Sequence, residues 1–177
     1  MSTPDVVIAA ARRSVFGKYR GGISAIRPDD LLGMTLVELR KALPDLDPAG
    51  IDDVIMGDAN GAGEDNRNVA RMASLLAGFP VSVPGVTLNR LCGSGAEAIV
   101  QAARAVRSGD MDLVIAGGVE SMSRAPYVLP KSDTPLDPRT RLEQTTVGWR
   151  MVNPEFPAHW TASLGECAQR KIGRAHV

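Results

Sequence analysis

Short apolar runs alternate with longer segments in which apolar residues recur at helical spacing through the first two thirds of this chain. Short continuous apolar runs are typical of strands that are buried on both faces. Strands that alternate with helices in this way predict an α/β fold, in which a mainly parallel sheet has helices on both faces and right-handed crossovers. The predicted strands are 6–11, 53–57 and 113–116, and the predicted helices are 31–43 and 68–77.

The segment from Val86 to Gly109 is the most informative strand–helix unit. It reads as a short strand, a Gly-rich corner that contains Cys92, and a helix for which Gly109 supplies a left-handed C-terminal cap. Apolar side chains point in nearly every direction around this helix, and such a helix is usually buried between layers. We therefore expect it in the interior of the fold.

Cys92 is the first candidate for chemistry, because a thiol where a helix begins lies close to unpaired backbone N–H groups and the positive end of the helix dipole. Those conditions favour a thiolate nucleophile. The small residues Gly93, Ser94 and Gly95 would leave N–H groups free to hold a developing oxyanion. A free cysteine is also commonly a buried, unreactive side chain. The residue pattern alone leaves both interpretations open.

A second interpretation of the corner is a dinucleotide-binding loop. Gly93-x-Gly95-x-x-Ala98 fits the loose form of that fingerprint, and Glu120 follows the next strand, where an acid would bind a ribose. The fingerprint normally opens the first strand–helix unit of its domain, whereas this one lies in the third. An NAD-binding oxidoreductase is therefore the weaker alternative.

Acidic residues stand before two of the predicted helices. Asp29 or Asp30 is expected to cap the helix that begins at Leu31. Glu64 and Asp65 could serve acid–base chemistry or bind a metal, but no His is near and the next helix follows at once. We therefore interpret this pair as charges that favour a helix N-terminus.

The composition describes an ordinary globular protein of one domain or slightly more, with 177 residues of which 44% are hydrophobic. Its 20 basic and 20 acidic residues balance, which gives no electrostatic reason to expect nucleic acid or an anionic membrane as a partner. No apolar run is long enough for a membrane span, and the first residues lack the basic region of a signal peptide. Two cysteines far apart, Cys92 and Cys167, make no disulfide framework, so we expect a cytoplasmic protein.

Beyond Glu120 the chain is rich in proline and shows little periodicity. Such a long irregular segment is usually a functional excursion from a compact fold. Within it, His159 stands beside Trp160, and we interpret it as part of loop packing. Cys167 is interpreted as an ordinary helix thiol, because no basic residue is closer than Arg170.

The motif around the cysteine carries a family resemblance. The sequence N-R-L-C-G-S-G-A-E-A-I (89–99), followed by A-G-G-V-E-S-M-S (116–123), is similar to the acyl-enzyme region of the thiolases, the acetyl-CoA acyltransferases. Two further segments, 57–71 and 13–22, fit the same family, and the resemblance covers roughly 5–170. The run E-D-N-R-N-V-A-R most resembles the branch of 3-oxoadipyl-CoA and acetyl-CoA acyltransferases.

The resemblance implies a layered α-β-α thiolase fold, in which two similar halves pack across buried helices. This chain would supply the N-terminal domain at 1–118, still incomplete, and the start of a loop domain at 119–171. The resemblance also implies that the protein uses acyl-CoA and coenzyme A as substrates, with no permanently bound cofactor and no metal. The resemblance further implies a homodimer or a homotetramer for the full-length protein.

Two residues take roles from the resemblance. Cys92 would be the nucleophile that carries the acyl group, with its own N–H in the oxyanion hole. Leu164 stands where many thiolases have a Met near the substrate, so we expect an apolar substrate contact there, whereas Ser163 replaces the neighbouring His. The implied reaction moves an acyl group between 3-oxoacyl-CoA or acetyl-CoA and CoA, by thiolysis or in reverse by Claisen condensation. A non-catalytic acyl-CoA-binding protein is the alternative within the family.

The last residues, 172–177, resemble nothing in the family at this point. Their sequence can be back-translated to ATC GGA AGA GCA CAC GTC, a familiar sequencing-adapter string. We therefore expect a non-native tail in which His176 is not biological. The activating His and the second Cys of a thiolase would lie outside this chain. We expect the chain alone to be inactive and to expose apolar surface meant for the missing half.

Overall fold

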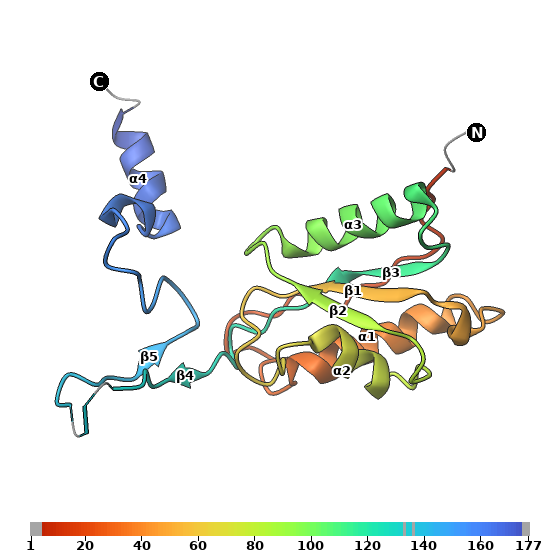
Figure 1. The fold of residues 1–177 in the computed structure, drawn as a ribbon, viewed down its shortest axis with the longest axis horizontal. Helices are drawn as coiled ribbons and strands as arrows, with labels where there is room; N and C mark the ends of the chain where they lie inside the picture. The colour runs from red at the N-terminus through yellow and green to blue at the C-terminus, as the bar shows by residue number, and fades with distance from the viewer. Residues whose placement is uncertain (1–4, 133, 136, 175–177) are drawn as a thin grey trace. The chain divides into compact units, whose positions relative to one another are not determined.

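The computed structural model describes residues 5–132, 134–135 and 137–174, and it divides after Arg124 into two compact units. The first unit is a three-stranded parallel sheet with helices on both faces, so the expected α/β class is confirmed (Figure 1). Its elements are α1 (Pro28–Lys41), η1 (Pro48–Gly50), β1 (Asp53–Gly57), α2 (Val69–Leu76), β2 (Gly85–Leu88), α3 (Ser94–Ser108) and β3 (Val114–Gly118).

Strand β1 lies in the middle of the sheet, which has the order β2–β1–β3. Gly57 at the end of β1 is paired in parallel with Leu88 of β2 and Gly118 of β3, so the carboxyl ends of all three strands meet at one edge. Ligands of parallel α/β sheets gather at this edge. The corner that contains Cys92 follows β2 and therefore lies there.

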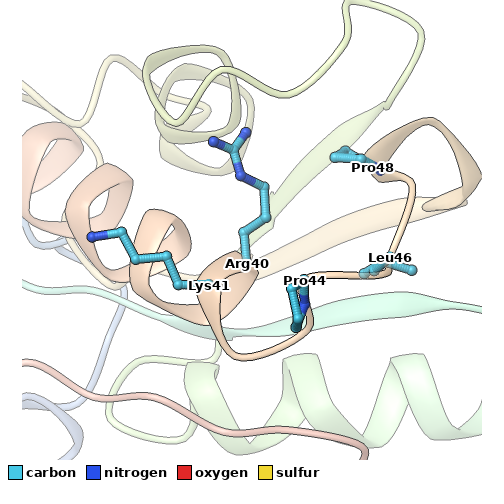
Figure 2. A pocket seen from close by; sticks show the side chains of 5 residues that line it. All are labelled: Arg40, Lys41, Pro44, Leu46 and Pro48. Atoms are coloured by element: carbon cyan, nitrogen blue, oxygen red, sulfur yellow. The ribbon is translucent and has the colours of Figure 1, made fainter.

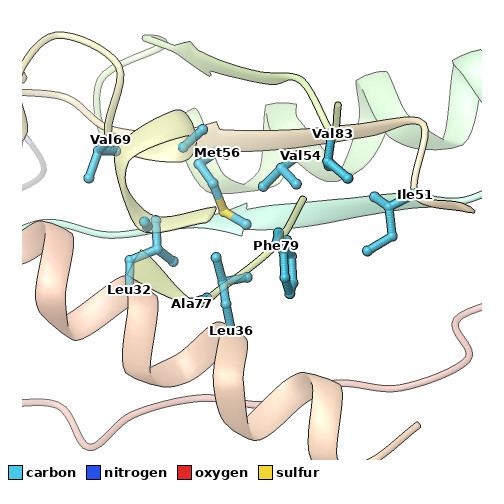
Figure 3. Packing of buried hydrophobic residues seen from close by; sticks show 11 residues of the cluster. Leu32, Leu36, Ile51, Val54, Met56, Val69, Ala77, Phe79 and Val83 are labelled. Atoms are coloured by element: carbon cyan, nitrogen blue, oxygen red, sulfur yellow. The ribbon is translucent and has the colours of Figure 1, made fainter. Parts of the chain in front are cut away.

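The core forms because β1 alternates its side chains between two layers of helix. Val54 and Met56 pack with α1 and α2 in the larger cluster, whereas Ile55 packs with α3 on the opposite face. Figure 3 shows the larger cluster, in which α1 contributes Leu32 and Leu36. Its remaining buried members are Ile51, Val69, Ala70, Ala73, Ala77, Phe79 and Val83.

The start of α1 differs from the expectation. The helix begins at Pro28, with Arg27 in the N-cap position and no side-chain cap, so the prediction that Asp29 or Asp30 caps it is wrong. Proline is favoured at the first helical position, because its ring fixes φ near the helical value and because it lacks the N–H that would be unpaired there. The Asp29 carboxylate lies inside the first turn and pairs with Arg27 at 2.8 Å.

The start of α2 also differs. Asn68 caps this helix by accepting from the Arg71 N–H at 3.3 Å, and the first turn contains no acid. The interpretation of Glu64 and Asp65 as helix-terminal charges is therefore wrong. Glu64 is bound by the guanidinium of Arg124, and Asp65 is buried, because both belong to the loop between β1 and α2 and lie several residues before the helix begins.

Helix α3 packs against the other face of the sheet. It ends at Gly109, which adopts the expected left-handed conformation with φ of 81°. Only Ser94, Ala98 and Ala102 are buried, while Ile99 is 51% exposed. In the described part of the first unit, the sheet covers one face of α3 and no second layer covers the opposite face, so the expected covering on all sides is not found there.

Residues 6–11 do not form the strand that their apolar run predicts. Val7 and Ile8 are 79% and 82% exposed. A strand needs a neighbour that completes its hydrogen-bond ladder and layers that cover its faces. In the described part of the sheet, neither edge strand pairs with this segment, so the sheet does not cover its apolar side chains.

The second unit, described by itself, has little regular structure. An antiparallel pair joins β4 (Tyr127–Val128) to β5 (Glu143–Gln144), and the unit continues through η2 (Ala158–Trp160) to α4 (Leu164–Arg174). The identity of this segment as a loop domain, with a boundary at 118, stays a prediction. Of the expected non-native tail, 172–174 continue α4, while His176 lies outside the described residues. None of the described helices is long and apolar enough to cross a membrane.

The end of β1 and the start of α3 are in backbone contact. A Cβ atom at Gly57 would lie 2.3 Å from the carbonyl carbon of Ser94 and 2.5 Å from the nitrogen of Gly95. Because both neighbours are backbone atoms, no rotamer change can make room. Glycine is therefore required at the point where α3 crosses the sheet edge.

The substitution Gly57→Ala should consequently destabilise the chain by about 2–4 kcal/mol, since α3 would have to move off the sheet. Urea unfolding monitored by circular dichroism measures this. Gly50→Ala is the matched control, because a Cβ there meets nothing within 4 Å, and it should change stability by no more than about 0.5 kcal/mol. Equal effects of the two substitutions would contradict the close contact.

Candidate functional site

Cys92 lies at the tip of a tight corner between β2 and α3. Two backbone bonds close the corner: Gly93 N–H donates to the Arg90 carbonyl at 3.1 Å, and Ser94 N–H donates to the Leu91 carbonyl at 3.0 Å. Leu91 adopts a left-handed conformation with φ of 50°, which is unfavourable for a residue with a side chain. The reversal leaves Cys92 exposed, so the alternative of a buried thiol is not what the structure shows.

Ser94 fastens the corner from its helix side. Its hydroxyl accepts from the Arg90 N–H at 2.8 Å and donates to the Leu91 carbonyl at 2.6 Å, although only 4% of the residue is exposed. A buried hydroxyl that satisfies two backbone groups makes the turn costly to open. Ser94 therefore supports the Cys92 corner as well as starting α3.

The N–H groups after the cysteine are used differently from the expectation. Those of Gly93 and Ser94 donate inside the corner, so the prediction that N–H groups are free for an oxyanion is wrong for these two residues and stays a prediction for Gly95. A chain that reverses direction within so few residues has to satisfy its own backbone groups first. The role of the Cys92 N–H itself stays a prediction.

A hydrogen-bonded link joins the corner to the end of β1. The Asn89 side-chain amide donates to the Ala59 carbonyl at 2.9 Å and accepts from the Leu91 N–H at 2.8 Å. Ala59 N–H in turn donates to the Glu120 carboxylate at 2.9 Å. The loops after all three strands are thereby connected at the carboxyl edge of the sheet.

Three carboxyl groups interact at this edge. Asp58 follows β1, Glu120 follows β3, and Asp65 approaches from the loop before α2. Loss of hydration raises the pKa of Asp58 and of Glu120. Burial, reinforced by the Asp58 charge, raises the pKa of Asp65 to about 7. The edge therefore holds three carboxyl groups with raised pKa values, of which Asp65 shows the largest rise.

Sequence reasoning did not identify Asp58 or Asn89, and it gave Glu120 only the role of a ribose-binding acid. A signal for them exists. Asp58 comes directly after a buried strand, and Asn89 and Glu120 follow the other two strands at nearly the same level. Polar residues immediately after adjacent parallel strands converge at one edge.

The other residues singled out from the sequence lie in the second unit. Leu164 is the first residue of α4 and is 80% exposed, and its expected substrate contact stays a prediction. The ring of His159 lies 6.1 Å from the ring of Trp160, edge to face, which agrees with loop packing. Cys167 is an exposed thiol within α4.

A hollow of about 380 Å³ lies toward the amino ends of the strands (Figure 2). Its position follows from its residues, which end α1 or precede β1, whereas Cys92 is at the carboxyl edge. Arg40, its principal polar residue, already donates to the Ala77 carbonyl at 3.4 Å. The hollow therefore adds nothing to the cysteine site. The residues that line the hollow are Arg40, Lys41, Pro44, Leu46 and Pro48.

Within the described residues no group of His, Cys, Asp and Glu could hold a metal ion.

Comparison with known proteins gives this fold and corner a class. Residues 6–156 match the family model described as the thiolase N-terminal domain, and the chain belongs to the thiolase family. The chain is 54% identical over 151 residues to the beta-ketoadipyl-CoA thiolase of Acinetobacter baylyi, covering 85% of this chain and 38% of that relative. It is 54% identical over 166 residues to the 3-oxoadipyl-CoA/3-oxo-5,6-dehydrosuberyl-CoA thiolase of Escherichia coli K12, covering 93% of this chain and 41% of that relative.

The solved structures agree. The crystal structure of the Bacillus anthracis acetyl-CoA acetyltransferase superposes with a TM-score of 0.77 at 30% identity, covering 91% of this chain and 39% of that one. The family resemblance and the thiolase fold are thus confirmed. The chain spans about 40% of the length of the curated relatives it matches.

The raised pKa of Asp65 predicts a pH-dependent stability. A carboxyl group whose pKa is higher in the folded state stabilises fully below its unfolded pKa, and that contribution is lost as pH rises through about 7. Asp65→Asn removes this titration. Between about pH 4 and about pH 8, the unfolding free energy of the unchanged chain should therefore fall by about 2–4 kcal/mol relative to the variant.

Chemical denaturation across that pH range measures the difference. The exposed Asp45 provides the control, since Asp45→Asn should follow the unchanged chain at every pH. If Asp65→Asn also follows the unchanged chain, the carboxyl group of Asp65 is hydrated in solution, and the interacting acidic group at the sheet edge is not formed.

Proposed function

We propose that the whole protein to which this sequence belongs is an acyltransferase of the thiolase type that acts through an acyl-enzyme on Cys92. The observation that supports this most directly is an exposed thiol held at a constrained strand–helix corner, within a segment that matches the thiolase N-terminal domain. Such a corner presents a nucleophile while keeping its backbone fixed.

The chemistry follows from the substrate class. The Cys92 thiolate attacks the 3-oxo carbon of a 3-oxoacyl-CoA, and the bond between C2 and C3 breaks. Its electron pair remains on C2, which takes a proton to release acetyl-CoA. The sulfur of a second CoA then attacks the Cys92 thioester, forms the shortened acyl-CoA and restores the cysteine. The same steps in reverse constitute a Claisen condensation.

The relatives suggest the acyl group. The Acinetobacter and Escherichia coli proteins are named for beta-ketoadipyl-CoA and 3-oxoadipyl-CoA, so we propose an acyl chain that ends in a second carboxylate. Coenzyme A is a co-substrate in this scheme and not a bound cofactor. We further propose a homodimer or homotetramer for the full-length protein, and a reducing, cytoplasmic location, which suits two free cysteines.

The dinucleotide alternative finds little support at the corner. A pyrophosphate would need the N–H groups that open α3, but those of Gly93 and Ser94 already donate to Arg90 and Leu91. A non-catalytic acyl-CoA-binding protein would keep the same corner. Such a protein would bind acyl-CoA without converting it, so an assay of acyl-CoA cleavage distinguishes it from the enzyme.

The assay uses the protein that is encoded when the reading frame is followed in genomic DNA past the codon for Arg170. CoA-dependent cleavage of 3-oxoadipyl-CoA should depend on Cys92, and Cys92→Ser should lower kcat by at least about a thousandfold, because the weaker nucleophile cannot form the thioester efficiently. Cys167→Ser is the matched control and should retain activity.

Binding of acyl-CoA without turnover by the unchanged protein would favour the non-catalytic alternative. Full activity of Cys92→Ser would refute the acyl-enzyme. The 177-residue chain alone should show no cleavage, since we expect the acid–base groups in the additional length that the relatives have.

A further inference from the structure

Leu91 is the residue that turns Cys92 outward, and its conformation needs support. With φ of 50° it occupies the left-handed region, which L residues other than glycine rarely adopt. Such a conformation persists only where surrounding contacts determine it. Two side chains hydrogen-bond to Leu91 directly: the Ser94 hydroxyl donates to its carbonyl, which the Ser94 N–H also contacts, and the Asn89 side chain accepts from its N–H.

Asn89 differs from Ser94 in its location and in the second group that its side chain binds. Ser94 belongs to the buried start of α3, whereas Asn89 is exposed and lies outside both hydrophobic clusters. Its carboxamide uses both ends: the oxygen holds the Leu91 N–H, and the nitrogen holds the Ala59 carbonyl. Asparagine and glutamine are the side chains that carry a donor and an acceptor on one planar amide group. The shorter of the two suits a contact that spans two residues.

The far end of this link is anchored as well. Ala59 N–H donates to Glu120, and Asp58 N–H donates to the carbonyl of Leu88, the residue directly before Asn89, at 3.1 Å. The backbone at Asp58 and Ala59 is therefore held by β2 and by Glu120 in addition to its bond with Asn89. Asn89 transmits the position of this fixed turn to Leu91 and so to Cys92.

We propose that Asn89 is a positioning residue for Cys92, which holds Leu91 in its left-handed conformation by joining the Leu91 N–H to the Ala59 carbonyl. This inference deepens the proposed function and rests on it for its catalytic meaning. The positioning itself is a property of the corner. Without Asn89, Leu91 relaxes toward the right-handed region, and Cys92 leaves its place before the N-terminus of α3, where a thiol is most reactive.

The alkylation rate of Cys92 by iodoacetamide tests the proposal in the 177-residue chain. Mass spectrometry follows each cysteine separately, and Cys167 is the internal reference because it is exposed in the other unit. Asn89→Ala should slow alkylation of Cys92 relative to Cys167 by roughly threefold to tenfold, the factor that one lost hydrogen bond corresponds to. An unchanged or faster rate would overturn the proposal.

A rescue experiment distinguishes positioning from a general structural role. Glycine adopts the conformation of Leu91 without steric cost, so in a Leu91→Gly background the effect of Asn89→Ala should shrink to less than about twofold. An equal loss in both backgrounds would mean that Asn89 acts elsewhere. Asn89→Ser serves if the alanine variant does not fold: its hydroxyl can still accept from the Leu91 N–H but loses the amide that holds the Ala59 carbonyl, so its rate should fall between those of the unchanged chain and Asn89→Ala. A rate equal to that of the unchanged chain would mean that the link to Ala59 is not needed.

Asn153 supplies the matched control. Its side chain accepts from the Glu155 N–H at 2.9 Å in a similar turn of the second unit, so Asn153→Ala should leave the Cys92 rate unchanged. The two proposals fail separately. If Asn89→Ala does not change the alkylation rate of Cys92, the role of Asn89 is overturned, whether or not Cys92 is the nucleophile. Full acyl transfer by Cys92→Ser overturns the acyl-enzyme and leaves the positioning result intact.

Discussion

The backbone contact between the end of β1 and the start of α3 is the constraint on which the site depends. Gly57 has no side chain, and this lets the Ser94–Gly95 peptide group come down onto the central strand. Because α3 is held so close, the chain that enters it from β2 has to reverse within a few residues. The reversal pushes Leu91 into a left-handed conformation and leaves Cys92 at the tip.

The same edge of the sheet concentrates polar groups, of which Asp58 and Asp65 are buried. Parallel strands end together, so Asp58, Asn89 and Glu120 converge, and the buried Asp65 is added by the loop before α2. Carboxyl groups that lose hydration near one another retain protons, which is the origin of the raised pKa of Asp65.

The apolar surface of the first unit exceeds what its own layers cover. The outer face of α3 presents Ile99 and Val100, at 51% and 40% exposure, and Val7 and Ile8 are exposed in a run that reads as a buried strand. Burial of one such side chain stabilises by about 1.5–3 kcal/mol, so these positions leave a substantial contribution unrealised. A chain that spans about 40% of its relatives is consistent with a sequence patterned for layers beyond those it contains.

The sequence by itself determined the local features. The strand at 53–57, the left-handed cap at Gly109, the place of Cys92 between a strand and a helix, and membership of the thiolase family could all be predicted, because each rests on neighbouring residues or on a contiguous motif. Only the tertiary structure decided which faces are covered and which polar groups meet. Periodicity shows that a segment is suited to burial, but burial needs a covering surface, and the described part of the first unit offers none to residues 6–11 or to the outer face of α3. Likewise, Asn89 meets Ala59 only because β2 lies beside β1, a pairing that no local pattern encodes.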